Sequence, residues 1–322
     1  MIIEGTIQNL AFGGDGVMRA DDGRVVFVPY TIPGERVAVE LTDVKKNFAR
    51  GKLVTIIETN SKRVRAPCEY YGRCGGCQLQ HMTYEAQLEF KQKFVQDALT
   101  RIEKLDVAVK PVIAADPIWH YRRRIDLRGN DFVDINKCLI YSGKKENTFD
   151  IDGLIFEYSD KAFVQAHPTQ SARLYRDLAA QLAAKRVLDL YCGIGVISLL
   201  MAKNGAEVLG VEGNPEAIRL AKVNSKANAL NVKYLLGDVN EVATQLCETY
   251  KPDLIIVNPP RTGINKPILN AKHIFYISCM PSTLARDLAI LVKQGYRIDA
   301  CQPYDMFPQT THVEIWVSLS RI

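Results

Sequence analysis

The second half of the chain alternates short apolar runs with longer stretches in which apolar residues recur every three or four positions. The runs that predict buried strands lie at 186–191, 207–212, 232–236 and 254–258. The stretches that predict amphipathic helices lie at 171–184, 197–204 and 215–228. Strands that alternate with helices over this length are typical of a doubly wound α/β domain, which we place at residues 166–322.

The first 57 residues have a different pattern, in which short β-rich runs are separated by turn residues. The runs lie at 5–9, 25–29, 36–41 and 52–57. Gly13-Gly14-Asp15-Gly16, Asp21-Asp22-Gly23 and Pro33-Gly34 are typical turn sequences between them. This density of short strands predicts a small closed barrel over residues 1–57, a shape often used to bind oligonucleotides. A barrel that binds protein would have the same pattern.

Residues 58–165 form a third part with a mixed pattern, which we treat as a central domain. It begins with clustered cysteines. A stretch with helical spacing follows at 84–102, and residues 107–165 indicate a further β-containing segment. The sequence contains no internal repeat and no low-complexity tract.

The composition is that of a globular protein with a modest positive charge. Hydrophobic residues make up 47% and charged residues 24% of the chain, and the formal net charge is +5. The segment 45–65 holds seven basic residues against the single acid Glu58, and Arg122-Arg123-Arg124 forms a second basic run. Such clusters suit a phosphate backbone, but a solvated charged face explains them equally well.

The sequence shows neither a membrane span nor a secretory leader. The longest apolar run, 187–202, contains Asp189 and two glycines and is shorter than the roughly 20 residues that a span needs. The first residues lack a basic region before an apolar stretch. We therefore expect a cytoplasmic protein without membrane attachment, and we predict no obligate protein partner.

A nucleotide-type site is predicted where the strand at 186–191 runs into the turn Cys192-Gly193-Ile194-Gly195. Glycines let the backbone approach a ligand closely, and the next strand ends in Glu212, which can bind ribose hydroxyls. Ser198 replaces the third glycine of the NAD fingerprint, and Asp189 suits the cationic amino end of S-adenosylmethionine better than a pyrophosphate. The later strands end at Asp238, expected beside the adenine, and at the polar turn Asn258-Pro259-Pro260-Arg261.

Two motifs near the C-terminal end resemble those of RNA (uracil-5-)-methyltransferases. The segment 277–287 (ISCMPSTLARD) resembles the cysteine motif of that family, and 307–314 (FPQTTHVE) resembles its C-terminal motif. Residues 1–57 resemble its TRAM domain, and Cys68-x5-Cys74-Gly75-Gly76-Cys77-Gln78 resembles its iron–sulfur motif. The resemblance covers essentially the whole chain in the same order. It implies a class I (Rossmann-like) methyltransferase domain that is preceded by an OB-like TRAM barrel and a small iron–sulfur domain.

The chemistry of such enzymes requires a nucleophile and a base. Uracil C5 is a poor nucleophile, but attack of a thiolate at C6 gives C5 the carbanion character needed to take a methyl group from a sulfonium. A carboxylate then removes the C5 proton so that the thiol can leave. By the resemblance, Cys279 is the nucleophile and Glu314 is the base. Without it, Cys279 would be a small buried hydrophobe and Glu314 a strand acid facing solvent. Alternation along a strand places His312 on the same face as Glu314.

The resemblance also assigns the cofactor contacts. The expected S-adenosylmethionine-binding residues, which include the two glycines of the turn, are Gln165, Tyr191, Gly193, Gly195, Glu212, Asp238 and Asn258. Val196 stands where the family often has a polar residue, so we expect no polar cofactor contact there. Met280 replaces a common asparagine, and position 258 is aspartate in some branches of the family.

The clustered cysteines predict a metal centre, because disulfides are rare in cytosolic proteins. By spacing alone, zinc is at least as good a candidate as iron. The resemblance implies a [4Fe–4S] cluster held by Cys68, Cys74, Cys77 and Cys138 with a structural or RNA-positioning role. The stretch between Cys138 and Gln165 is much shorter than usual in the family, so part of the central domain is expected to be missing.

We therefore expect an S-adenosylmethionine-dependent enzyme that makes 5-methyluridine in RNA, with 23S ribosomal RNA as the substrate. Transfer RNA is the first alternative. An adenine amino methyltransferase is a second, because Asn-Pro-Pro also occurs in such enzymes, although an aromatic residue usually follows it there. A non-catalytic RNA-binding assembly factor is a third, and intact Cys279 and Glu314 argue against it.

Overall fold

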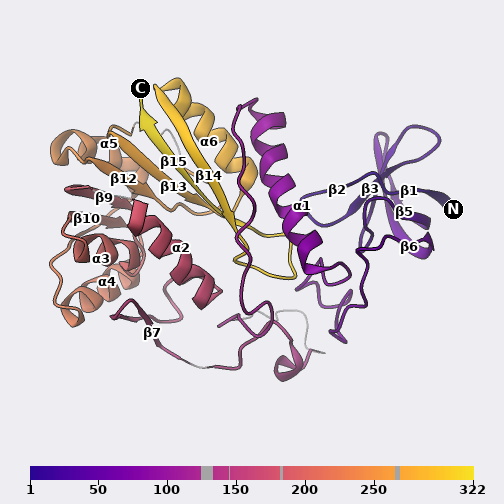
Figure 1. Ribbon diagram of the computed structural model, residues 1–322, viewed down its shortest axis with the longest axis horizontal. Helices are drawn as coiled ribbons and strands as arrows, with labels where there is room; N and C mark the ends of the chain where they lie inside the picture. Colours follow the sequence, from indigo (N-terminus) through magenta and orange to yellow (C-terminus); the bar gives the residue numbers. More distant parts are fainter. Residues whose placement is uncertain (125–132, 145, 182–183, 265–268) are drawn as a thin grey trace.

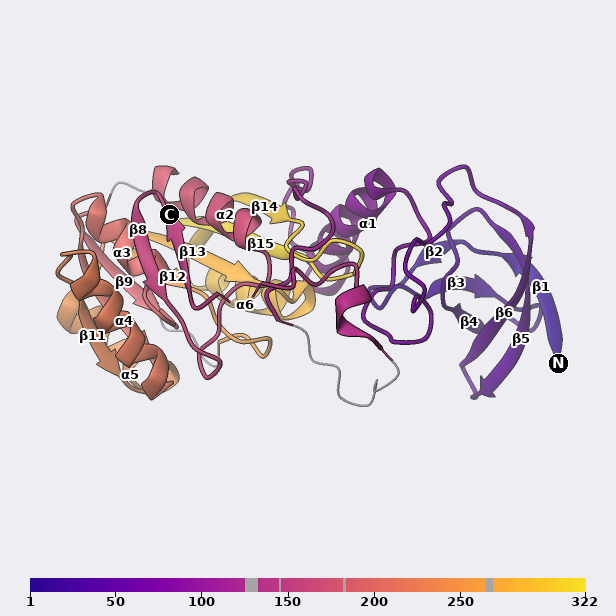
Figure 2. The same ribbon diagram turned by 90° about the horizontal axis from the view of Figure 1, so that it is seen from below.

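The computed structural model describes residues 1–124, 133–144, 146–181, 184–264 and 269–322. A β-barrel lies at one end of the elongated molecule and an α/β domain at the other, with a helix and irregular segments between them (Figures 1 and 2). Among the described residues, the longest helices are too short and too polar to span a bilayer.

Six strands form the N-terminal barrel. They are β1 (Ile2–Thr6), β2 (Asn9–Leu10), β3 (Gly16–Arg19), β4 (Val25–Val28), β5 (Arg36–Val44) and β6 (Phe48–Glu58). The sheet order is β1-β5-β6-β4-β3-β2, so its two edge strands are separated by only two residues along the chain. The sheet must therefore curl until its edges approach, as the sequence predicted. Alternate side chains such as Met18, Val26 and Val39 fill its interior.

The central segment has little regular structure apart from one long helix. Its elements are α1 (Tyr84–Asp97), the π-helical turn η1 (Ala98–Ile102), the 3-10 turn η2 (Ile135–Lys137) and the hairpin β7 (Thr148–Ile151) and β8 (Leu154–Glu157). Thr83 caps α1 by accepting a hydrogen bond from the amide of Ala86. The helix predicted at 84–102 is confirmed, with its last turn in π-helical form.

Seven strands form the sheet of the α/β domain. They are β9 (Arg186–Leu190), β10 (Glu207–Glu212), β11 (Lys233–Leu236), β12 (Leu254–Val257), β13 (His273–Ser278), β14 (Tyr296–Tyr304) and β15 (Glu314–Arg321). The order is β11-β10-β9-β12-β13-β15-β14, and β15 alone runs antiparallel to its neighbours. The predicted doubly wound α/β architecture is therefore confirmed, because β9 lies inside the sheet with the chain winding outward on both sides.

Helices cover both faces of this sheet (Figure 1). They are α2 (Pro168–Gln181), α3 (Val196–Lys203), α4 (Pro215–Ala227), α5 (Val239–Tyr250) and α6 (Pro281–Lys293). One core holds residues of α2, α3 and α4, and the other holds residues of α5 and α6. Residues 182–183, the end of the helix predicted at 171–184, lie outside the described residues.

The central segment is built onto the α/β domain. Val95 of α1 and Leu99 of η1 belong to the same apolar core as α6, and α6 packs directly on η1. Residues 109–113 run beside β14 through bridges from Val109 to Cys301 and from Ile113 to Tyr304. Helix α1, which follows the clustered cysteines, therefore packs beside the sheet of the α/β domain, as Figure 1 shows.

Candidate active site

The strand ends bring almost all of the predicted site residues to one edge of the sheet. Tyr191, Asp238 and Asn258 follow β9, β11 and β12, and Cys279 follows β13. Glu212 ends β10. Because β15 is antiparallel, its first residue, Glu314, lies at the same edge. Ligands of open α/β sheets bind at this edge.

A cavity of about 1000 Å³ opens there. The predicted residues that line it are Gln165, Tyr191, Gly193, Glu212, Asp238, Asn258, Cys279 and Glu314. The predicted cofactor and catalytic residues thus share one cavity, which is large enough for a cofactor together with a nucleobase. The amide oxygen of Gln165 is buried without a hydrogen-bond partner among the described residues, so it is available to a ligand.

The glycine turn has its shape because two of its residues adopt the left-handed conformation. Gly193 has a φ of 54° and lines the cavity, while Gly195 has a φ of 85° and is the N-cap of α3. Gly195 does not line the cavity. A Cβ at this position would lie 2.5 Å from the hydroxyl of Tyr234. Gly195 therefore serves the packing of the turn, and its predicted contact with the cofactor stays a prediction.

Backbone amides hold the acids on the cavity wall in place. Glu212 accepts hydrogen bonds from the amides of Gly193 (3.1 Å) and Asn214 (2.8 Å). Asp238 caps α5 by accepting from the amide of Asn240 at 2.8 Å. These bonds orient the carboxylates before any ligand arrives, as recognition of ribose and adenine requires.

Asp189 does not have the predicted role. Its side chain is fully buried, does not line the cavity, and accepts a hydrogen bond from Ser198 at 2.5 Å. Burial raises its pKa to about 7. Ser198, which replaces the third glycine of the NAD fingerprint, is thus the hydrogen-bond partner of Asp189 behind the turn. The expectation that Asp189 faces the amino group of the cofactor is therefore wrong.

Cys279 and Glu314 both line the cavity, and the charge of Glu314 affects the pKa of Cys279. Burial raises the pKa of the Cys279 thiol, and the negative charge of Glu314 raises it further. The positive charge of the Arg261 guanidinium opposes both effects, and its capacity to donate a hydrogen bond to the sulfur acts in the same direction. The sequence assigned Arg261 no role at the reacting atoms. Its place in the rigid turn after β12, beside Asn258, was the available signal.

Glu314 has the environment of a general base. Its side chain is 3% exposed, and it accepts a hydrogen bond from the amide nitrogen of Gln165 at 3.3 Å. Burial raises its pKa to about 7, while Gln165 and the charge of Arg261 lower it. A carboxyl group that titrates near neutral pH can accept a proton and release it again. An isolated strand acid on the solvent face, the alternative from sequence, is excluded.

His312 and Glu314 do not share a strand face, contrary to our expectation. Strand β15 begins only at Glu314, and the amide of His312 instead bonds the hydroxyl of Thr310 in the preceding turn. The ring of His312 lies between Phe12 of the barrel and Phe307. Among the predicted pair, only Glu314 lines the cavity.

Arg122, Arg123 and Arg124 line the mouth of the cavity, but two of them are held by the protein itself. The guanidinium of Arg123 lies 4.6 Å from the ring centroid of Phe149. Arg124 donates hydrogen bonds to the carbonyls of Ser159 and Ala162. These contacts brace the segment that leads to Gln165.

The four cysteines of the predicted metal centre lie in one region of the central segment. Burial raises the pKa of Cys77 to about 12, and the charges of Cys138, Cys74 and Cys68 raise it as well. Cys77 and Cys138 pack with Tyr121 and Ile140. Within the described part of the chain, no three His, Cys, Asp or Glu side chains are grouped tightly enough to hold a metal ion. As placed, the thiols therefore do not form a coordination set.

The strand order and the cavity together define a class I methyltransferase. A solved structure with the same fold is the Pyrococcus abyssi tRNA (uracil-54, C5)-methyltransferase in complex with S-adenosyl-L-homocysteine. It has a TM-score of 0.77 and 24% identity, and the match covers 98% of this chain and 99% of that chain.

Sequence comparisons identify the family. The profile described as tRNA (uracil-5-)-methyltransferase matches residues 136–322, and that of the TRAM domain matches residues 3–54. An uncharacterized RNA methyltransferase of Protochlamydia amoebophila is 36% identical over 99% of this chain and 98% of its own length. One of Halalkalibacterium halodurans is 32% identical over 97% of this chain and 95% of its own length. The chain therefore belongs to the tRNA (uracil-5-)-methyltransferase family and is an S-adenosylmethionine-dependent RNA methyltransferase.

The chain is shorter than these relatives. The alignment with the Protochlamydia protein extends over 425 positions, which exceeds the 322 residues of this chain by 103. At least that many positions of the alignment therefore have no residue in this protein. The alignment length does not locate these positions along the chain, so the shortening expected between Cys138 and Gln165 stays a prediction.

Proposed function

We propose that this enzyme methylates C5 of uridine in RNA through a covalent adduct between Cys279 and C6. The observation that carries the proposal is the juxtaposition of a cysteine, a carboxyl group with a pKa near 7 and a guanidinium in one cavity with the glycine turn. These are the groups that nucleophilic addition and a later proton transfer require.

The reaction follows from the positions of these side chains. Cys279 loses its proton to solvent, with the charge of Arg261 stabilising the thiolate, and its sulfur bonds to C6 of the uracil. The electron pair of the C5–C6 double bond moves into the ring as an enolate. Tyr191, Glu212 and Asp238 would hold S-adenosylmethionine, whose sulfonium methyl group would be the electrophile for this chemistry. C5 takes that methyl group as its bond to sulfur breaks, and S-adenosylhomocysteine is the leaving group. Glu314 then removes the C5 proton, the double bond re-forms, and the Cys279 thiolate leaves.

An RNA that carries 5-fluorouridine tests the covalent step. Fluorine cannot leave C5 as a cation, so Glu314 has no proton to remove and the adduct should persist. Incubation with the cofactor labelled in its methyl group should give a labelled protein–RNA band on a denaturing gel, absent with the Cys279→Ala variant. Methylation of normal RNA without any such band from 5-fluorouridine RNA would overturn the covalent mechanism. It would favour an amino methyltransferase.

We propose 23S ribosomal RNA as the substrate, with transfer RNA as the alternative. The TRAM domain and the family match support an RNA substrate of either kind. Mass-spectrometric mapping of 5-methyluridine in RNA from a deletion strain tests this. Loss of the modification from 23S ribosomal RNA is expected. Loss from transfer RNA alone would make transfer RNA the substrate, and unchanged RNA would favour an assembly factor.

We also propose that Cys68, Cys74, Cys77 and Cys138 hold a [4Fe–4S] cluster with a structural role. The four cysteines lie in one region of the central segment, and closing on a cluster would require them to move together, because the described residues do not group them as a coordination set. The reaction above uses no step at the cluster. Anaerobically purified protein should be brown and contain about four irons per chain. Stoichiometric zinc without iron would overturn the proposal.

A further inference from the structure

The loop between β14 and β15, residues 305–313, leads directly to Glu314. It contains neither strand nor helix, although most of its residues are buried, among them Asp305, Gln309 and Thr310. Buried backbone groups must find hydrogen-bond partners. Because the loop provides few of these hydrogen-bond partners itself, its conformation depends on the segments that pack against it.

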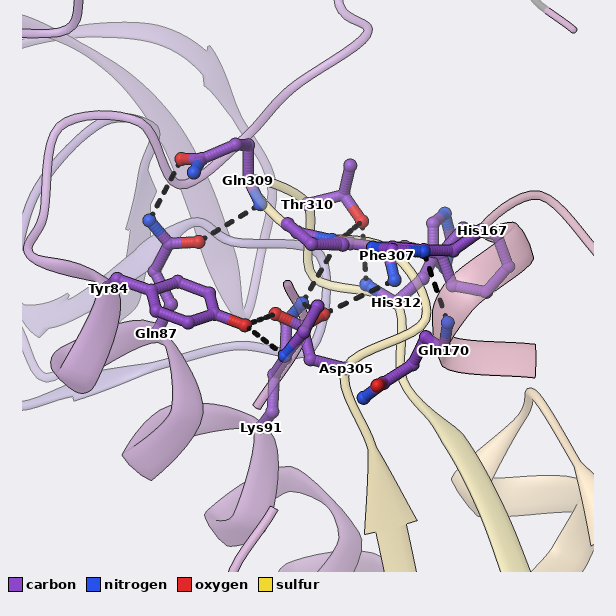
Figure 3. A network of polar contacts seen from close by, with 12 residues as sticks. Tyr84, Gln87, Lys91, His167, Gln170, Asp305, Phe307, Gln309, Thr310 and His312 are labelled. Atoms are coloured by element: carbon purple, nitrogen blue, oxygen red, sulfur yellow. Dashed lines mark hydrogen bonds and ion pairs between the residues drawn. The ribbon is translucent and has the colours of Figure 1, made fainter. Parts of the chain in front are cut away.

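The partners come from the central segment. Three successive carbonyls accept bonds from residues outside the α/β domain, as Figure 3 shows in part. Phe307 accepts from the ammonium of Lys91 at 3.0 Å, and Pro308 accepts from the hydroxyl of Tyr121 at 3.0 Å. Gln309 accepts from the amides of Gln78 and Leu79, which directly follow Cys77. Gln309 itself has a φ of 70°, so this backbone is held in a sparsely populated conformation.

Lys91 lies at the centre of this network (Figure 3). Its ammonium contacts Asp305 at 2.5 Å, and both side chains have no exposed surface. Asp305 also accepts from the hydroxyl of Tyr84 (2.9 Å) and the amide of Phe307 (3.2 Å). A buried ion pair contributes little stability compared with apolar residues of the same volume, so its conspicuous effect here is to fix geometry.

The ion pair is adjacent to Glu314 in the sheet. Tyr304, the last residue of β14, pairs in register with Glu314, and Asp305 is the next residue. The end of β14 and the loop therefore leave and re-enter the sheet beside the carboxylate. A shift of Asp305 moves the backbone that sets the direction of the Glu314 side chain.

We propose that Lys91 is a positioning residue for Glu314, acting through Asp305 and the carbonyl of Phe307, so that the central segment completes the catalytic site. The inference rests on the proposed role of Glu314 as the base. It deepens that role, because it makes proton removal from C5 depend on a helix that does not line the cavity. The methyl-transfer step, which Cys279 initiates, depends less on this loop.

The test uses Lys91→Met combined with Asp305→Asn, which removes both charges and leaves none buried without a partner. We expect kcat to fall about 10- to 100-fold, because small misplacements of a catalytic group have effects of that size. Proton removal should become rate-limiting. A methylated protein–RNA adduct should accumulate, and RNA with deuterium at uridine C5 should show a larger kinetic isotope effect than with the unchanged enzyme. Affinity for S-adenosylmethionine should stay the same.

Two further variants keep the test decisive. Lys93→Met removes a lysine of the same helix that pairs with Asp97 on the surface, and should behave as the unchanged enzyme. Tyr84→Phe removes only a hydroxyl, which bonds Asp305 and the amide of Ala115, and should show the same isotope signature more weakly. It decides the matter if the double variant does not fold.

An unchanged isotope effect in both Tyr84→Phe and the double variant would overturn the proposal. Loss of both adduct formation and affinity for S-adenosylmethionine would also overturn it, because that result indicates general disruption of the site. Glu314→Gln separates this failure from failure of the proposed function. If Glu314→Gln accumulates adduct while the Lys91 variants turn over normally, only the positioning role is wrong. If Glu314→Gln itself turns over freely, the base assignment is wrong.

Discussion

At the scale of single residues, the site depends on how three charges are balanced in a buried space. Cys279 and Glu314 oppose each other, because each negative charge disfavours the other, and Arg261 stabilises both. The charge of Arg261 therefore favours the thiolate form of Cys279 beside the carboxylate. The chemistry uses the two groups in succession, which suits a pair that cannot easily both be charged.

Replacing Arg261 should therefore impair the nucleophile. In Arg261→Gln, the pKa of the Cys279 thiol rises, since its stabilising cation is gone. Alkylation of Cys279 by iodoacetamide should shift to higher pH, and kcat should fall about 10- to 100-fold, because a hydrogen bond to a charged group contributes roughly 1.5–3 kcal/mol. Arg219→Gln, on the surface of α4, is the control. An unshifted alkylation profile would show that Arg261 does not stabilise the thiolate.

Burial of Glu314 should be visible in stability. Its pKa rises from 4.5 to about 7 on folding, so the folded protein binds more protons than the unfolded chain between these values. Stability therefore falls as pH rises through this window. Glu314→Gln removes the effect, so its gain in Tm should be larger at pH 8 than at pH 5. Glu248→Gln, an exposed acid, should show no such difference, and a pH-independent gain would contradict the assignment.

The sequence identified Cys279 and Glu314 only because each lies in a recognisable motif. Neither residue type at those positions indicates catalysis without the motif, since burial and partners come from the fold. Arg261 and Lys91 were missed because their partners, Cys279 and Asp305, are distant in sequence and are brought close only by the fold. Asp189 was misjudged because alternation along β9 cannot tell a cavity wall from the interior behind it.

At the scale of elements, the site is a product of strand ends and one turn. Strand β10 has the predicted bounds, Glu207–Glu212, because apolar residues and flanking turns mark both ends. The irregular loop 305–313 has no such periodicity, since its hydrogen bonds go to another part of the chain. Regular elements were therefore predictable from local pattern, and the loop that leads to the base was not.

The turn makes an element-scale prediction. Gly195→Ala should destabilise the protein by about 1–3 kcal/mol, because a φ of 85° disfavours a side chain and the new methyl group meets Tyr234 at 2.5 Å. Adding Tyr234→Phe should recover part of the loss. Gly13→Ala, where no atom lies within 4 Å, is the control in urea denaturation. Equal stability of the two alanine variants would show that the turn tolerates a side chain.

At the scale of the whole molecule, the barrel lies at one end and the α/β domain that holds the cavity lies at the other (Figure 2). The basic segment 45–65 is less uniform than its sequence indicated. Arg63 is held by the buried carboxylate of Glu35 and is structural. Lys46, Lys52 and Arg65 are exposed and form no ion pair with any described residue, so they are the cations available to phosphates.

Neutralising Lys46, Lys52 and Arg65 to glutamine should weaken binding to different RNAs alike. The slope of log affinity against log salt should flatten by about 2–3, because each phosphate contact contributes roughly one counterion. Turnover at saturating RNA should change less. Lys226→Gln with Lys251→Gln, which removes two exposed cations at the C-terminal ends of α4 and α5, is the control. An unchanged slope in the triple variant would make the segment a solvated face.

The central claim is that Cys279 acts before methyl transfer and Glu314 after it. The most direct measurement compares Cys279→Ala and Glu314→Gln with methyl-labelled cofactor and RNA on a denaturing gel. Cys279→Ala should give no methyl transfer and no adduct, whereas Glu314→Gln should give a protein–RNA adduct that carries the label. Near-normal turnover by Cys279→Ala, or free turnover by Glu314→Gln without adduct, would contradict the account.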